Sequence, residues 1–393
     1  MARRVSLFFF CAVACHSKST PATDLAPNDA AVADLADFSV PLDLTPLHLA
    51  FKPFGSGLIV GARPGGLATG DLNGDGAPDL VVTNMDENNL TVLLGDGQGG
   101  FATPTKQTVP GDGPGSLVLA DLNQDGKLDV AVANYKSAEL VVMFGRGDGG
   151  FDVVGKVAVG ANPLGIDVGD FDGDGRKDIA VGSFGGGGIA VNYGNADGSP
   201  GHSDRLTAPT GVQSVIVADL NQDGKLDIAA LSYLTDVISL YWGSGDGSFQ
   251  NGKTLSTTHL PCAMTAADLN RDGIFDLIVG STDASVVEIH LGKTGGEFDD
   301  TKAYGAGLLT RVPVVADFNG DGKLDVAATG GSGTCVTVFR GHGDGTLSSG
   351  LTIGVGDNPA ALVTADFDRD GLADLAVSNY DNGSLTVLLN RSQ

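Results

Sequence analysis

Cysteine and basic side chains are both scarce in this chain of 393 residues. Two of the four cysteines, Cys11 and Cys15, fall within the first 15 residues, so too few remain for a disulfide framework. Cys262 and Cys335 either form one bridge or stay as two thiols, and thiols are favoured because the sequence does not give their Cα separation. Lys and Arg number 23 against 48 Asp and Glu, and the formal net charge of −25 argues against binding DNA or RNA phosphates.

Patterns that mark common catalytic sites and helices are also missing. There is no G-x-S-x-G nucleophile motif, and no segment has a convincing helical period of apolar residues. None of the six histidines has zinc-ligand spacing. They are His16, His48, His202, His259, His290 and His342. The sequence therefore indicates neither a helical domain nor a recognisable catalytic constellation.

The N-terminus has the features of an export signal. Two arginines precede an apolar run, Val5 to Ala14, which at about ten residues is too short to span a bilayer. The run ends in Ala12-Val13-Ala14-Cys15, which resembles a bacterial lipobox without its usual leucine. We expect residues 1–15 to be a signal peptide with Cys15 lipidated; a conventional signal peptide is the alternative. His16 in place of Asp favours the outer membrane or cell surface, with a periplasmic or secreted location as alternatives.

Residues 16–50 differ in composition from the rest of the chain. They are rich in Ala, Pro and Asp and have neither a helical nor a strand period. Such a segment cannot bury a core, so we expect a disordered linker. The linker would hold a globular body, residues 51–393, away from a membrane.

A nine-residue pattern recurs seven times in this body. It reads Asp, apolar, Asn or Asp, any residue, Asp, Gly, any, any, Asp, and we call it the acidic loop, with positions 1 to 9. The loops recur every 49 or 50 residues. They begin at Asp71, Asp121, Asp170, Asp219, Asp268, Asp317 and Asp366. A period of this length is typical of a β-propeller, in which each repeat is one blade.

Each repeat contains four short apolar runs that predict strands. In the second repeat they are Ser116–Ala120 before the loop, then Val130–Ala133, Leu140–Phe144 and Val153–Val159. The runs are rich in β-branched residues and are bounded by glycine, as strands are. Four strands per repeat predict an all-β fold, a seven-bladed β-propeller with four-stranded blades.

The two ends of the body predict how the ring closes. The last repeat stops after its third strand, Leu385–Leu389, while an orphan segment, Phe51–Val60, precedes the first loop with the spacing of a fourth strand. We therefore expect the N-terminal strand to complete the last blade, which removes an exposed sheet edge.

The acidic loop has the composition of a calcium site. Oxygen side chains at positions 1, 3 and 5 can converge from a tight turn, glycine at 6 permits that turn, the carbonyl at 7 points inward, and the carboxylate at 9 closes the shell. Calcium takes six to eight oxygens in flexible geometry. Three or four carboxylates per loop repel one another, which favours a cation over metal-free Asp-Gly turns. We predict up to seven Ca²⁺ ions, each bound with an affinity on the order of 10⁻⁴–10⁻³ M.

The predicted ligands use 23 of the 48 acidic residues, with Asn at position 3 in five loops and Asp in two. Loop by loop they are Asp71, Asn73, Asp75, Ala77, Asp79; Asp121, Asn123, Asp125, Lys127, Asp129; Asp170, Asp172, Asp174, Arg176, Asp178; Asp219, Asn221, Asp223, Lys225, Asp227; Asp268, Asn270, Asp272, Ile274, Asp276; Asp317, Asn319, Asp321, Lys323, Asp325; Asp366, Asp368, Asp370, Leu372, Asp374.

The loop and its spacing resemble the FG-GAP repeat of integrin α chains and the related bacterial VCBS repeat, over the whole of residues 51–393. The resemblance implies a propeller in which the calcium loop joins the first and second strands of each blade. Together with the lipobox-like Cys15 it implies a bacterial surface lipoprotein. The Phe-Gly and Gly-Ala-Pro signatures themselves are weak, so no integrin-like activity is implied.

A partner is expected on the face opposite the acidic loops. Loops between second and third strands differ from repeat to repeat, and variable loops on a rigid ring commonly carry binding. Aromatic residues recur there, either to stack on sugars or, as we favour, to pack between blades. They are Tyr135, Phe184, Tyr233 and Tyr380. We expect a monomeric binding or adhesion module of the cell envelope for a protein or glycan, attached to a membrane only through a lipid anchor.

Two other functions stay open. A carbohydrate lyase or glycosidase would need a cluster of His, Tyr, Arg and carboxylates at the central mouth, where Arg63, His259 and Arg311 are scattered candidates. A structural envelope lipoprotein without a soluble ligand is the other. Because propellers host many activities, the fold does not choose between them, and the missing catalytic pattern favours a protein that is not an enzyme.

Overall fold

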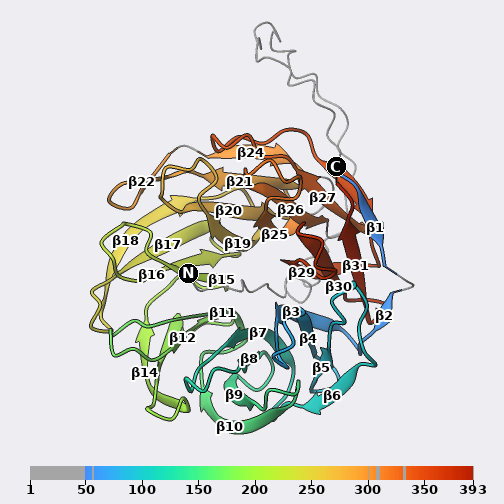
Figure 1. Cartoon of the computed structure of the whole chain (residues 1–393). Helices are drawn as coiled ribbons and strands as arrows, with labels where there is room; N and C mark the ends of the chain where they lie inside the picture. The colour runs from blue at the N-terminus through green and yellow to red at the C-terminus, as the bar shows by residue number, and fades with distance from the viewer. Residues whose placement is uncertain (1–48, 55–56, 300, 307–309, 331–332, 393) are drawn as a thin grey trace, which may run out of the picture.

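The computed structural model describes residues 49–54, 57–299, 301–306, 310–330 and 333–392. All regular secondary structure in these ranges is β-strand, and seven sheets follow one another around a ring (Figure 1). The predicted fold, an all-β propeller with seven blades, is confirmed. Among the described residues there is no helix with the length and hydropathy needed to cross a membrane.

Each blade is an antiparallel sheet, and we number the blades 1 to 7 in the order of their acidic loops. Blades 1 to 4 consist of β3 (Pro64–Gly70), β4 (Asp79–Asn84), β5 (Asn89–Leu93), β6 (Thr105–Thr108); β7 (Pro114–Ala120), β8 (Asp129–Asn134), β9 (Glu139–Gly145), β10 (Phe151–Ala158); β11 (Pro163–Gly169), β12 (Asp178–Ser183), β13 (Ile189–Gly194), β14 (Pro200–Leu206); and β15 (Val212–Ala218), β16 (Asp227–Ser232), β17 (Val237–Gly243), β18 (Phe249–Ser256).

Blades 5 to 7 follow the same plan with small additions. They consist of β19 (Pro261–Ala267), β20 (Asp276–Ser281), β21 (Val286–His290), β24 (Lys302–Gly305); β25 (Thr310–Ala316), β26 (Asp325–Gly330), β27 (Cys335–Phe339), β28 (Leu351–Gly354); and β29 (Pro359–Ala365), β30 (Asp374–Asn379), β31 (Ser384–Asn390) with β1 (Phe51–Pro53) and β2 (Leu58–Ile59). A separate hairpin in blade 5, β22 (Gly292–Lys293) and β23 (Glu297–Phe298), was not predicted.

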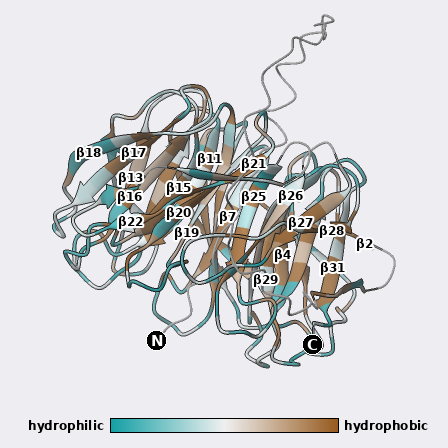
Figure 2. Ribbon diagram, turned by 90° about the horizontal axis from the view of Figure 1, so that it is seen from above, coloured by the Kyte–Doolittle hydropathy of each residue, from teal (hydrophilic) through white to brown (hydrophobic). Residues whose placement is uncertain are grey.

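Burial changes across each blade from the ring axis outward. The second strand is buried at every residue in all seven blades, whereas the outer strand β6 is exposed at three of its four residues. A second strand lies between two neighbouring blades, so both of its faces bury apolar side chains, as in Ile228–Leu231. Figure 2 shows the consequence: hydrophobic strands fill the body of the disc, and hydrophilic residues gather in the loops.

The ring closes as predicted. β1 pairs with β31 in antiparallel register, Phe51 opposite Asn390, so the blue and dark red ends of the chain lie side by side in Figure 1. The fourth strand predicted over 51–60 is split, with β1 and β2 each pairing separately with β31. One further bond follows Pro53, from the N–H of Phe54 to the carbonyl of Val387 at 2.8 Å.

The described residues include the end of the predicted linker and two of the four cysteines, but not the predicted signal peptide. The predicted signal peptide with Cys15, and the linker up to residue 48, lie outside the described residues. At the end of the predicted linker, Ala50 bonds to the C-terminal segment: its N–H donates to Ser392 Oγ at 3.2 Å, and its carbonyl accepts from the N–H of Arg391 at 2.5 Å. Cys335 is a free cysteine, so no bridge joins it to Cys262.

Candidate metal-binding site

Each acidic loop occupies the same place in its blade. It starts directly after the first strand and ends at the first residue of the second, as in blade 1, where β3 ends at Gly70 and β4 begins at Asp79. Strand direction alternates within a blade, so all seven loops lie on one face of the ring, together with the turns between third and fourth strands. This placement agrees with the sequence prediction.

Positions 1 and 5 shape the loop by accepting backbone hydrogen bonds. In blade 1, Oδ2 of Asp71 accepts from the N–H of Gly76 at 2.8 Å, and Oδ1 of Asp75 accepts from the N–H of Ala77 at 2.7 Å. Both bonds recur in all seven loops. Gly76 has φ of 81°, a conformation that glycine adopts without steric cost. The turn therefore holds its carboxylates close together.

The carboxylate at position 9 is buried and has a second role that the sequence did not indicate. In blade 1, Oδ2 of Asp79 accepts from the N–H of Leu72 at 2.8 Å, and Oδ1 accepts from the N–H of Gly95, beyond the third strand, at 2.7 Å. The same two bonds occur in every blade. This aspartate therefore ties the loop to the third strand besides facing the other carboxylates.

Burial raises the pKa of the position 9 carboxyls. It raises the pKa of Asp178, Asp227, Asp276 and Asp325 to about 6 and that of Asp374 to about 7. The carboxylates at positions 3 and 5 add a smaller upward effect in Asp178 and Asp374, because like charges disfavour ionisation. A bound cation would reverse both effects.

The hydrogen bond from the third strand to the position 9 aspartate has a signal in the sequence, a glycine 24 residues after the start of the loop. Six of the seven repeats have it, and Asn390 stands there in blade 7. A Cβ atom on Gly95 would lie 2.3 Å from the carbonyl oxygen of Pro78, so a side chain does not fit at this position in blade 1. The recurring glycine thus indicates that the third strand packs closely against the loop, which the pattern of apolar residues alone did not reveal.

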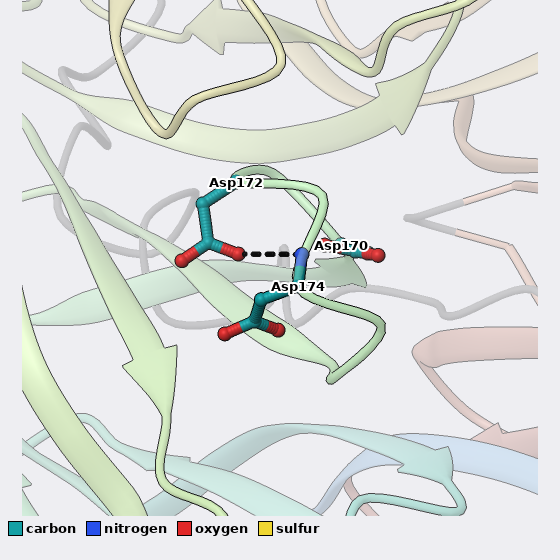
Figure 3. Close-up of side chains that lie close together, drawn as sticks. All are labelled: Asp170, Asp172 and Asp174. Carbon is teal, nitrogen blue, oxygen red and sulfur yellow. Dashed lines mark hydrogen bonds between the residues drawn. The ribbon is translucent and has the colours of Figure 1, made fainter.

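Two loops bring three carboxylates into one cluster. Ligand oxygens of Asp170, Asp172 and Asp174 lie within 4.8 Å of one another, and so do those of Asp366, Asp368 and Asp374. These are the two loops with Asp at position 3. Figure 3 shows the first cluster folded around its turn, with Oδ1 of Asp172 accepting from the N–H of Asp174 at 3.1 Å.

The other five loops carry an amide oxygen at position 3. In blade 1, Oδ1 of Asn73 accepts from the N–H of Asp75 at 3.0 Å, as Asp172 does in blade 3. Side-chain oxygens at 1, 3, 5 and 9 with a carbonyl at 7 form an all-oxygen donor set. Hard divalent cations, calcium above all, prefer such a set.

Arginine side chains already balance some of these charges. Arg340 lies 3.1 Å from Asp321, Arg176 contacts Asp174, and the guanidinium of Arg391 lies against two carboxylates of the blade 7 loop. With Arg369, which lies 3.7 Å from Asp75, arginines contact position 5 in blades 1, 3, 6 and 7 and position 3 in blade 7.

On the opposite face, the recurring aromatic residues pack between blades. Tyr233 and Tyr380 are 2 % and 7 % exposed, and the ring centroids of Phe184 and Tyr233 lie 6.0 Å apart. Arg63 covers the Tyr380 ring at 5.6 Å from its centroid. Tyr135 is partly buried against the largest hydrophobic cluster. These contacts favour the packing interpretation over open sugar platforms.

The three residues considered for an enzyme belong to separate blade junctions. Arg63, between blades 7 and 1, pairs with Asp86 at 3.3 Å. His259, between blades 4 and 5, is exposed and bonds to Asp236 at 2.7 Å. The third, Arg311 of β25, is buried, and its Nη1 donates to Asn358 near blade 7 at 2.7 Å. Each residue is engaged locally, with a different partner.

Comparison with known families and structures agrees with this geometry. The family described as FG-GAP-like repeat matches six times, and each match spans two consecutive acidic loops. The matches cover residues 71–132, 121–181, 170–230, 219–279, 268–328 and 317–377. No curated protein matches the chain.

Solved structures with a similar fold are distant in sequence. An Agrocybe aegerita lectin that recognises non-reducing terminal N-acetylglucosamine is 18% identical, with a TM-score of 0.51 over 85% of this chain and 87% of that one. A chain of the BBS1N complex with ARL6DN is 14% identical, with a TM-score of 0.61 over 87% and 97%. The WD40 domain of Toxoplasma gondii coronin is 13% identical, with a TM-score of 0.55 over 87% and 86%. At these identities the likeness concerns the fold alone.

Proposed function

The chain belongs to the FG-GAP-like repeat family, and we propose that it is a calcium-binding propeller of the cell envelope that presents one face to a protein or glycan partner. The observation that carries the calcium proposal is the convergence of carboxylate oxygens in the acidic loops, within 4.8 Å in blades 3 and 7. Carboxylates at this separation repel one another unless a cation or protons intervene.

Each loop would contribute the same groups to an ion. Side chains at positions 1, 3, 5 and 9 and the carbonyl at position 7 supply the oxygens, and calcium would supply the positive charge that lets all the carboxylates stay ionised in one turn. Position 9 is already fixed by two backbone N–H groups, as Asp79 is by Leu72 and Gly95. An ion at the loop would therefore be held against the first, second and third strands of its blade.

Thermal unfolding of the whole chain in calcium and in a chelator tests the calcium proposal. A ligand that binds only the folded state raises the melting temperature by mass action, so we expect a large rise in millimolar calcium and a smaller one in magnesium, which demands stricter octahedral geometry. Equal melting temperatures in calcium and chelator would reduce the seven loops to acidic turns.

A double variant and a control test whether calcium binds at the acidic loops. The double variant Asp170→Asn with Asp172→Asn, in the cluster of Figure 3, should reduce the number of bound calcium ions by one. Asp204→Asn changes an exposed aspartate on the outer strand β14, so it should leave the number unchanged.

The binding role is proposed for the face opposite the acidic loops. Its loops differ in sequence from blade to blade while the ring beneath them is a continuous packed body, which is the usual arrangement for recognition. An enzyme is disfavoured because Arg63, His259 and Arg311 each engage a different local partner. Screening the calcium-loaded chain on a glycan array and on envelope proteins tests this role. Binding lost on exchanging a loop of this face supports it, and no binding in either screen favours a structural envelope protein.

The envelope location is proposed from the N-terminal sequence. Cys15 ends the stretch Ala12-Val13-Ala14-Cys15, which resembles a lipobox, and lipidation there would anchor the chain. Fractionation of cells that express the natural chain or Cys15→Ser tests it. The natural chain should be found with membranes and the variant in the soluble fraction, whereas equal distributions would contradict an anchor on this cysteine.

A further inference from the structure

Position 4 of the acidic loop lies in the left-handed region of backbone space in every blade. Three loops have glycine there, and the other four have only Gln or Arg. The φ values are 76° for Gly74, 62° for Gln124, 75° for Gly173, 63° for Gln222, 63° for Arg271, 72° for Gly320 and 58° for Arg369. Residues other than glycine adopt this conformation at a cost in free energy. We therefore looked for a contact of the Gln and Arg side chains that would offset the cost.

That contact is made with the next blade. Nε2 of Gln124 donates to the carbonyl of Gly175 at 2.7 Å, linking the loops of blades 2 and 3. Nε2 of Gln222 donates to the carbonyl of Gly273 at 3.1 Å, linking blades 4 and 5.

The two arginines also extend toward the next loop. In blade 7, Nη2 of Arg369 donates to the carbonyl of Asp75 in blade 1 at 2.9 Å. In blade 5, Nη2 of Arg271 lies 3.7 Å from the position that a Cβ atom on Gly322 of blade 6 would take. The three hydrogen-bonded links, from Gln124, Gln222 and Arg369, each run to the loop that follows around the ring, whereas Arg271 only approaches the next loop.

The linked carbonyls belong to peptide groups that shape the neighbouring site. The peptide between Gly175 and Arg176 accepts from Gln124 at its carbonyl and donates from its N–H to Oδ1 of Asp174 at 2.8 Å. Asp174 and the carbonyl of Arg176 are both predicted ligands. The link therefore fixes the orientation of a peptide group that lies between two ligands of the next loop.

Where position 4 is glycine, there is no side chain to make such a link. Gly74, Gly173 and Gly320 therefore leave the steps from blade 1 to 2, 3 to 4 and 6 to 7 without one. The hydrogen bonds therefore join six of the loops in three pairs: blades 7 and 1, blades 2 and 3, and blades 4 and 5.

We propose that the position 4 side chains of blades 2, 4 and 7 are positioning residues for calcium binding in the following loop, and that they couple the loops so that six of the seven sites fill as three pairs; this rests on the proposed calcium function. Calcium in one loop orders its position 4 residue, and the link then orders a peptide of the next loop before its own ion arrives. Two sites coupled in this way each raise the affinity of the other by the same factor.

The exchange Gln124→Gly tests the proposal with little risk to folding. Glycine occupies the equivalent position in three other loops at similar φ, so the backbone accommodates the change. We expect calcium affinity at one site, in blade 3, to fall about fivefold or more, the lower end of common coupling factors. Melting temperature in chelator should stay the same or rise. The readout is a calcium titration of the full chain against a competing fluorescent chelator.

Two further variants test whether the hydrogen bond of residue 124, and not only the presence of a long side chain, supports calcium binding in blade 3. Gln124→Arg keeps a donor of the kind used in blade 7 and should bind calcium in blade 3 more tightly than Gln124→Gly does. Gln124→Glu keeps the size but cannot donate, and should behave like Gln124→Gly. The matched control is Gln98→Gly, which removes an exposed glutamine from a turn on the same face and should not alter calcium binding.

Coupling itself is measured with Asp121→Asn, which removes a position 1 ligand from the blade 2 loop. In the natural chain it should weaken binding in blade 3 as well, and in the Gln124→Gly background it should have no further effect on blade 3.

The outcomes are distinct. An unchanged titration for Gln124→Gly overturns the inference while calcium binding stands. Equal loss of stability in chelator and in calcium makes Gln124 merely structural and also overturns it. A natural chain that binds no calcium overturns the proposed function, and the inference with it.

Discussion

In blade 7, Nη1 of Arg391 lies 2.6 Å from Oδ2 of Asp368, the position 3 carboxylate of the acidic loop. The same nitrogen donates to Asp370 at 2.8 Å, and these carboxylates raise the pKa of Arg391. The backbone N–H of Arg391 meanwhile donates to the carbonyl of Ala50, where the N-terminal segment joins the ring. One residue thus contacts both a candidate calcium site and the ring closure.

Removing this guanidinium should strengthen calcium binding in blade 7. Arg391→Gln deletes a cation that competes with calcium for Asp368 and Asp370. A half-exposed ion pair contributes about 0.5–1 kcal/mol, so calcium affinity at this site should rise about two- to fivefold. A calcium titration measures it. Arg146→Gln, which breaks an exposed pair with Asp152 in a turn, is the control and should have no effect. Weaker calcium binding in Arg391→Gln would contradict competition.

The calcium-free chain should lose stability as pH rises from 5 to 7.5. Burial raises the pKa of four position 9 aspartates from 3.8 to about 6 and that of Asp374 to about 7. The folded state therefore binds more protons than the unfolded state in this window, and the free energy of unfolding falls as those protons are released. Urea unfolding in chelator at several pH values measures the slope.

Calcium should reverse that slope, because the ion binds the deprotonated carboxylates. Exposed carboxylates with lowered pKa, such as Asp75 and Asp152, titrate below this window and do not mask the effect. A calcium-free chain that gains stability between pH 5 and 7.5 would show that the buried aspartates are ionised throughout.

Positions 5 and 9 should respond differently to loss of charge. Asp129 is fully buried and accepts two backbone N–H groups, so Asp129→Asn turns an amide donor toward one of them and should cost about 1–3 kcal/mol even in chelator. Asp125 is exposed, and Asp125→Asn should weaken calcium binding with little effect in chelator. Denaturant unfolding with and without calcium compares the two. Equal losses in chelator would mean that position 9 has no separate structural role.

Close packing between blades 5 and 6 should make Gly280 intolerant of any side chain. A Cβ atom there would lie 1.9 Å from the carbonyl oxygen of Arg311 on the next inner strand, so Gly280→Ala forces two backbones apart. The expected loss is about 1–3 kcal/mol or more, as for other overpacked sites. Gly305→Ala, in open space on β24, is the control and should be close to neutral. A thermal unfolding scan decides, and matching melting temperatures would show that the blades can move apart freely.

The sequence by itself determined the repeat, the strands and the place of the acidic loops. These follow from local chemistry, since alternating apolar runs and Asp-Gly turns specify strands and tight turns within one blade. The spacing of Phe51 before the first loop was enough to predict ring closure, because it repeats the spacing of other fourth strands.

Only the tertiary structure decided what each loop residue contacts beyond its own turn. The bond from Gly95 to Asp79, the link from Gln124 to Gly175 and the approach of Arg391 to its loop all join segments that lie far apart in sequence or in separate blades. Their geometry depends on how neighbouring strands and blades pack, and burial then decides which carboxylates titrate near neutral pH. A linear pattern records the residue types but not those distances, so it predicted the candidate ligands without the network of contacts around them.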